Sequence, residues 1–373
     1  MVILTIPAFC FQSEYYLYIS TGYSGNLPVL KVLPSGEIIN TGYLYATGQH
    51  PTMGLISTQN LLIVSSAIPS NGEFVTYKFN PDFTLTILSI TTSTTSVFYI
   101  NLTPNGKLIL KSTPYYNEIW SVDSLGIVSN TGNTFLGYFI NPVRSQGDIS
   151  ISANIGTGYM PVYQIDYVTM TLSSTQNIPF SNVNKIIFAP DGKLAIGIGS
   201  NLNNTFGGDV GLFTIDSSGS VSTTTTILYL GRDLRDATFT PDGRFVFLVP
   251  EGGPPAPIIT LQVNSNTTSL QDTGKRFQHP NANQIGWSLG GHVVQTTPDG
   301  RMLIYFYISS IDDKFYLATA WINGDGSLAW TGYDFPYESY FSDSLDYIQD
   351  MVIVPNYITS IPDELWQGFE KSP

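Results

Sequence analysis

Cysteine, charge and long apolar segments are all scarce in this chain of 373 residues. A single cysteine, Cys10, excludes an internal disulfide bond and a metal site built from cysteine pairs. No apolar run approaches the ~20 residues that a membrane-spanning helix needs, so no membrane insertion is expected. Lys and Arg number 15 against 28 Asp and Glu, for a formal net charge of -13. Nucleic acid is therefore not an expected partner, because phosphate binding needs a positive surface.

The abundant polar residues are Ser, Thr, Asn and Tyr, whereas only 12% of the residues are charged. Hydroxyl and amide groups hydrate such a surface, which depends little on carboxylates that acid would protonate. We expect an extracellular or virion surface, for which an acidic habitat is one setting; compositional drift in an ordinary secreted β protein is the alternative. The first residues, MVILTIPAFCFQSE, lack a basic segment and a small-residue cleavage site, so no signal peptide is expected.

A short phrase recurs along the chain: TPNG at 103–106, APDG at 189–192, and TPDG at 240–243 and 297–300. Each copy follows a short alternating segment and precedes Lys or Arg and an apolar run, which predicts strand, tight turn, strand. Pro fixes φ at the first turn position and Gly adopts the positive φ. Weaker copies at 53–60, 138–148 and 350–356 bring the number to seven.

A second phrase, an alternating strand that ends in an Asp, Asn or Pro turn, runs in step with the first, and a Thr-rich β-prone stretch follows each copy. Four antiparallel strands about every 50 residues are typical of β-propeller blades. We predict an all-β, seven-bladed β-propeller that forms a single domain over 1–373. The predicted blades are 12–50 with 348–356, then 51–95, 96–136, 137–182, 183–231, 232–276 and 290–335, followed by a tail over 357–373.

The two ends of the repeat pattern predict how the ring closes. The first strand, YYLYIS from Tyr15, has the character of a second strand without an inner strand before it. The last phrase, DMVIVPN at 350–356, is an inner strand without a second strand after it. We therefore expect the C-terminal strand to complete the first blade from inside, which would also remove two sheet edges.

The turn-and-hairpin pattern over about Tyr15 to Asn356 resembles the seven-bladed YVTN and lactonase-like propellers. This resemblance implies the fold, and its family includes lactone-hydrolysing enzymes, surface-layer proteins and binding modules. The literal YVTN signature is absent from the second strands. The charge-poor, Tyr-, Thr- and Asn-rich composition is also similar to that of structural proteins of viruses from hot acidic habitats.

The most elaborate loops, 275–291 and 333–349, flank the seventh blade on the face where the central channel opens. Exposed aromatic rings favour a flat protein partner or sugar rings; the alternative is that these rings cover the blade edge and the closing strand. The candidate binding residues are Tyr333, Asp334, Phe335, Tyr337, Tyr340, Phe341 and Trp287.

Polar residues at the starts of inner strands are the candidates for catalysis. His292 and Asp350 begin adjacent inner strands, so a His–Asp pair is a geometric option, and Arg235 would hold a substrate carboxylate. Asp236 and Lys185 lie in the same region. Solvated or mutually paired charges are the alternative interpretation, and it is the one we favour.

The leading hypothesis is a non-enzymatic structural or host-attachment propeller on an extracellular or virion surface. Its expected partners are other protein subunits or cell-surface glycans and proteins, and neither a cofactor nor a metal is expected. A lactonase-like hydrolase and a surface-layer or adhesion component are the alternatives. Asn203 and Asn266 are candidate glycosylation sites, because each begins an N-x-Ser/Thr sequence in an expected loop or turn.

Overall fold

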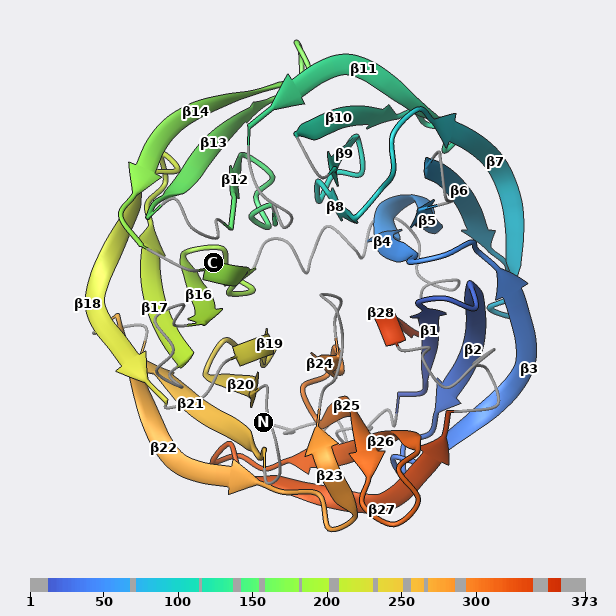
Figure 1. Ribbon diagram of the computed structural model, residues 1–373, viewed down its shortest axis with the longest axis vertical. Coiled ribbons are helices and arrows are strands. Elements are labelled where there is room, and N and C mark those ends of the chain that lie inside the picture. Colours follow the sequence, from blue (N-terminus) through green and yellow to red (C-terminus); the bar gives the residue numbers. More distant parts are fainter. Residues whose placement is uncertain are drawn as a thin grey trace, which may run out of the picture.

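A computed structural model describes most of the chain: residues 13–67, 72–113, 116–136, 142–153, 158–180, 183–200, 208–230, 234–250, 256–264, 268–285, 293–337 and 348–356. Seven antiparallel sheets stand side by side in a ring, each running from the central axis to the rim (Figure 1). The predicted fold class, an all-β propeller of seven four-stranded blades, is confirmed. No helix in the part of the chain that the structure describes is long and apolar enough to cross a membrane.

Blades 1 to 3 each contain four strands, ordered from the axis outwards. Blade 1 is β28 (Ile348–Pro355), β1 (Tyr15–Thr21), β2 (Asn26–Val32) and β3 (Ile38–Ala46); blade 2 is β4 (Thr52–Ile56), β5 (Leu61–Ala67), β6 (Gly72–Phe79) and β7 (Leu85–Ser93), with the short 3-10 helix η1 (Ser57–Gln59); blade 3 is β8 (Tyr99–Leu102), β9 (Leu108–Ser112), β10 (Asn117–Val122) and β11 (Val128–Phe135).

Blades 4 to 7 follow the same order around the ring. In blade 4 the innermost position is an isolated bridge, Val143 to Ser150, beside three strands. Blade 4 contains β12 (Ile149–Ile151), β13 (Met160–Asp166) and β14 (Thr171–Ile178); blade 5 contains β15 (Val183–Phe188), β16 (Leu194–Ser200), β17 (Gly208–Ile215) and β18 (Val221–Tyr229). Blade 6 contains β19 (Leu234–Phe239), β20 (Phe245–Pro250), β21 (Ile258–Asn264) and β22 (Ser269–Phe277); blade 7 contains β23 (Ala282–Ile285), β24 (Val294–Thr296), β25 (Met302–Ser309), β26 (Phe315–Ile322) and β27 (Leu328–Pro336).

Ring closure follows the prediction. Strand β28 pairs antiparallel with β1, placing Met351 opposite Ile19 and Val354 opposite Tyr16. Just beyond the pair, the backbone N–H of Asn356 donates to the carbonyl of Glu14 at 3.1 Å. The C-terminal strand therefore completes the first blade and leaves the ring without a gap between its first and last sheets.

The repeated turns have a second role that the turn chemistry alone does not reveal. Gly300 has a φ of 70°, which glycine adopts without strain. A Cβ added there would lie 3.3 Å from Cδ of Pro241, in the equivalent turn of the preceding blade. Gly147 approaches Pro104 in the same way, at 3.6 Å. In these turns the proline and the glycine therefore also pack neighbouring blades together.

The outer strands carry a recurrent bulge. In every sheet the pairing between the third strand and the outer strand shifts register near its middle. Thr41 and Thr131 each donate a side-chain hydrogen bond at 2.6 Å to a carbonyl on the adjacent third strand, and the glycine that follows each has a positive φ. Such bulges twist an edge strand away from pairing with other chains. The Thr-rich stretches thus protect the rim of the ring.

Blade 7 departs from the expected pattern. The loop expected over 275–291 contains β23, and both β23 and β24 pair with β25. Strand β25 has eight residues, enough to accept two short segments one after the other along its inner edge. Two inner segments therefore replace the single inner strand that the sequence indicates.

Candidate functional site

The first candidate region is the channel, where inner-strand residues from different blades meet. Lys185 on β15 donates to Asp236 on β19 at 2.5 Å, so this ion pair joins blade 5 to blade 6. The other carboxylate oxygen of Asp236 accepts the backbone N–H of Val293 at 2.7 Å, which joins blade 6 to blade 7. Lys185 is 4% exposed and Asp236 is fully buried. Lys185 and Asp236 thus act together as a tie across three blades.

Asp350 forms a second tie, between blade 1 and blade 2. Its Oδ2 accepts the backbone N–H of Met53 at 2.9 Å, and its Oδ1 accepts that of Met351 at 2.9 Å. Because both oxygens already accept hydrogen bonds, Asp350 holds two inner strands in place. Three of the five residues considered for catalysis, Lys185, Asp236 and Asp350, therefore have structural roles in this fold.

Tyr99 on β8 lies near the charges of Arg235 on β19 and Asp350 on β28, although these strands belong to three different blades. Burial and, to a lesser extent, the Asp350 carboxylate raise the pKa of the Tyr99 phenol to about 12, while the Arg235 guanidinium opposes that rise. Sequence inspection did not single out Tyr99. The signal that could have identified Tyr99 is its position at the start of the inner strand β8.

The second candidate region is the outer part of blade 7, where the aromatic binding residues were predicted. Tyr333 is 39% exposed, and Phe335 is half-buried against the core that blade 7 shares with blade 1. Tyr337 is fully buried and packs its ring on Phe306, with ring centres 5.8 Å apart. Tyr337 therefore belongs to the core and is not available to a partner, whereas Tyr333 is.

Asp334 lies beside a buried histidine, His279. The Nε2 atom of His279 is 3.2 Å from Oδ1 of Asp334, and its Nδ1 accepts the backbone N–H of Asn281 at 3.2 Å. The imidazole stacks on Tyr307 with ring centres 4.1 Å apart. Burial, followed by the charge of Asp334, raises the pKa of Tyr307. This cluster anchors the turn that leads from blade 6 into blade 7.

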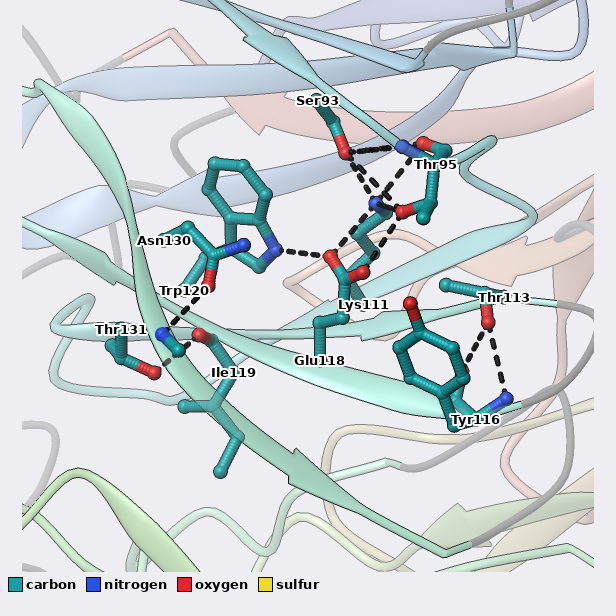
Figure 2. A network of polar contacts seen from close by, with 11 residues as sticks. Ser93, Thr95, Lys111, Thr113, Tyr116, Glu118, Ile119, Trp120, Asn130 and Thr131 are labelled. Atoms are coloured by element: carbon teal, nitrogen blue, oxygen red, sulfur yellow. Dashed lines mark hydrogen bonds and ion pairs between the residues drawn. The ribbon is translucent and has the colours of Figure 1, made fainter.

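A third polar region lies between blades 2 and 3, and no sequence motif pointed to it. Lys111 on β9 donates to Glu118 on β10 at 2.9 Å, and Figure 2 shows the ammonium and the carboxylate enclosed by Ser93, Thr95 and Trp120. Lys111 is fully buried and Glu118 is 5% exposed. The available signal was a lysine inside an apolar strand, LILKS.

Several sequence candidates lie outside the described residues: His292, Trp287, Tyr340, Phe341, Asn203, Asn266 and the tail over 357–373. Within the part of the chain that is described, no three His, Cys, Asp or Glu side chains gather as a metal-ligand set.

The geometry defines the class of protein as a seven-bladed β-propeller with polar ties between its inner strands. No family model matches the sequence, and no curated protein matches it. Solved structures do resemble the fold. A candidate 6-phosphogluconolactonase from Bacteroides fragilis is 15% identical with a TM-score of 0.69, and the match covers 93% of this chain and 99% of that one.

Two further structures show the same likeness. A protein from Lactobacillus plantarum is 13% identical with a TM-score of 0.70, covering 92% of this chain and 99% of the other. A hypothetical selenium-binding protein from Sulfolobus tokodaii is 11% identical with a TM-score of 0.69, covering 91% and 94%. At these identities the likeness concerns the fold alone.

Proposed function

We propose that this propeller is a non-enzymatic interaction platform on an extracellular or virion surface, which binds other protein subunits or cell-surface glycans. One observation carries the proposal: both carboxylate oxygens of Asp236 and of Asp350 accept hydrogen bonds, and each residue has at least one of these bonds from a neighbouring blade. Groups committed in this way stiffen a scaffold and are poorly placed to exchange protons with a substrate. The charge-poor, hydroxyl-rich composition supports the exposed location.

The location of the native protein tests this proposal. Antibodies against the chain would be applied to purified particles, cell-envelope fractions and cytosol. The proposal expects the protein in particles, or on the outside of the envelope if it is a surface-layer or adhesion component. A chain found only in the cytosol as a monomer would contradict it.

The binding surface is tested at Tyr333, with an internal control. Tyr43 is also 39% exposed and occupies the equivalent place on the outer strand of blade 1, because each tyrosine follows a Thr-Gly bulge. Binding to glycan arrays and to candidate subunits would be compared for Tyr333→Ala and Tyr43→Ala. We expect a loss of about tenfold only in the blade 7 variant, the effect of removing one interface aromatic. Equal binding by both variants would move the surface elsewhere.

A lactonase-like hydrolase is the second candidate, favoured by the charges of Arg235 and Asp350 that act on the Tyr99 phenol. In that case the guanidinium would hold an anionic group of the substrate, as a fixed positive charge does for a developing anion. Purified protein would be assayed on a panel of lactones, alongside Arg235→Ala. Turnover that disappears in a folded Arg235→Ala variant would establish the hydrolase and displace the platform proposal.

A further inference from the structure

The connector over residues 94–98 leads from the outer strand of blade 2 to the inner strand of blade 3. Both members of the buried Lys111–Glu118 ion pair form hydrogen bonds with it. The ammonium of Lys111 donates to the hydroxyl of Ser93 at 2.5 Å and to the carbonyl of Thr95 at 3.1 Å. The hydroxyl of Thr95 donates to Oε1 of Glu118 at 2.9 Å. Both charges therefore hold the same short segment (Figure 2).

The surroundings of the pair supply no substitute for either charge. The indole N–H of Trp120 donates to Glu118 at 2.8 Å, and Lys111 lies 5.4 Å from the centre of that ring. Strand β7 and the connector contribute only hydroxyl and carbonyl groups, from Ser93 and Thr95. Among the described residues, Lys111 and Glu118 are each the charge that acts on the other.

Protonation of Glu118 removes the counter-charge of a buried cation. Burial by itself would raise the pKa of Glu118, but the hydrogen bonds from Lys111, Trp120 and Thr95 outweigh it and hold the pKa below its ordinary value of 4.5. The pair is therefore intact near neutral pH and is lost as acid protonates Glu118. Once Glu118 is neutral, the ammonium is buried without a partner charge, which strongly favours its escape to water.

We propose that the Lys111–Glu118 pair is an acid-sensitive latch on the connector, and that acid releases residues 94–98 from blade 3. The connector leads directly to Phe98, which is 41% exposed, and to Tyr99, which lies near Arg235 and Asp350 at the channel. Opening the latch would therefore change both a surface aromatic and the polar wall of the channel. The fold offers this response whatever the partner of the propeller is.

Hydrogen exchange at single amides tests the latch on the whole chain. The reporter is the amide of Phe98, which donates to the carbonyl of Ser112 at 3.0 Å. The control is the amide of His50, which donates to Gly22 at 2.6 Å from the equivalent connector between blades 1 and 2. Protection factors, corrected for the intrinsic pH dependence of exchange, would be measured from about pH 7 to about pH 3, across the ordinary range of carboxyl titration.

The latch predicts that acid lowers protection at Phe98 by about tenfold or more while protection at His50 holds. Glu118→Gln keeps the shape and removes the charge, so it should show the loss already near neutral pH. The Lys111→Val, Glu118→Val double variant has nothing to titrate, so its protection at Phe98 should not change between neutral pH and acid. The proposal is overturned if wild-type protection at Phe98 survives acid, if both connectors open together, or if Glu118→Gln behaves like the wild type.

Discussion

Blades 2 and 3 fill the same buried position between their second and third strands with opposite chemistry. At one position of blade 2, Val64 on the second strand faces Val75 on the third. At the matching position of blade 3, Lys111 faces Glu118. Blades 5, 6 and 7 fill this position with Gly197 and Gly211, Leu248 and Ile259, and Tyr305 and Ala318. Other blades therefore fold without charged residues at this position, whereas blade 3 carries an ion pair there.

The difference shows that the ion pair is not required for folding in general. A buried pair gains Coulomb energy but loses hydration, so it is often no more stabilising than an apolar pair of similar size. What the blade 3 pair adds is a set of directed contacts to the connector, which two valines cannot make. Four variants test this view, and they are described from the largest expected effect to the smallest.

Removing one partner should have the largest effect. Lys111→Met fills similar space but leaves the Glu118 carboxylate buried without its cation. Loss of one member of a buried pair typically costs about 3–5 kcal/mol. Chemical denaturation of the variant near neutral pH measures the free energy of unfolding. A cost below about 1 kcal/mol, typical of exposed pairs, would show that the charge is effectively solvated.

Moving the pair into blade 2 should also be costly. Val64→Lys with Val75→Glu recreates both charges where the valines pack, but the shell formed by Ser93, Thr95 and Trp120 surrounds the pair in blade 3. We expect a loss of about 2–4 kcal/mol, because buried charges need hydrogen bonds as well as each other. A double variant as stable as the wild type would show that the shell is dispensable.

The connector contact should contribute less. Thr95→Val keeps the shape of the side chain and removes the hydroxyl that donates to Glu118. The expected loss is about 1–3 kcal/mol, the range for a hydrogen bond to a charged group. Ser121→Ala serves as a control, because the Ser121 hydroxyl makes only a hydrogen bond of 3.3 Å at an exposed site. Similar losses in both variants would argue against a special role for Thr95.

Replacing both charges by the blade 2 solution should change stability least. Lys111→Val with Glu118→Val is expected to unfold within about 1 kcal/mol of the wild type near neutral pH, or to be more stable. Since the folded-state pKa of Glu118 is depressed, its stabilisation is present above 4.5 and lost as the pH falls further. The double variant should therefore gain on the wild type in acid. Thermal unfolding at several pH values measures this, and a constant difference would contradict it.

The features of the fold that depend on local chain chemistry could be predicted from the sequence. Tight turns need proline and glycine at fixed positions, so the turns at 240–243 and 297–300 could be predicted from the sequence alone. Closure was legible too, because an unpaired inner strand at one end matches a missing inner strand at the other. The Thr-Gly pairs at Thr41 and Thr131 were present as a signal for the outer-strand bulges, but a bulge is defined by register with a neighbour.

The candidate site was harder to predict from the sequence, because its contacts join residues of different blades. Asp236 and Asp350 were selected as polar residues near the channel, yet apart from Lys185, which binds Asp236, their partners in other blades are backbone amides of Val293 and Met53. Main-chain donors leave no trace in a sequence. Tyr337 illustrates the converse error: a residue in an aromatic, acidic segment looks exposed until the packing on Phe306 is known.

The pairing of β28 with β1 also sets the timing of folding. The side chains of Asn356 and Glu14, which meet at 2.8 Å, are separated by 342 positions along the chain. Contacts that distant carry a large loop-closure entropy and form late. During synthesis the first blade must wait, one strand short, until nearly all of the others have been made. Any chaperone that shields the exposed edge of β1 in that interval would govern the yield of finished rings.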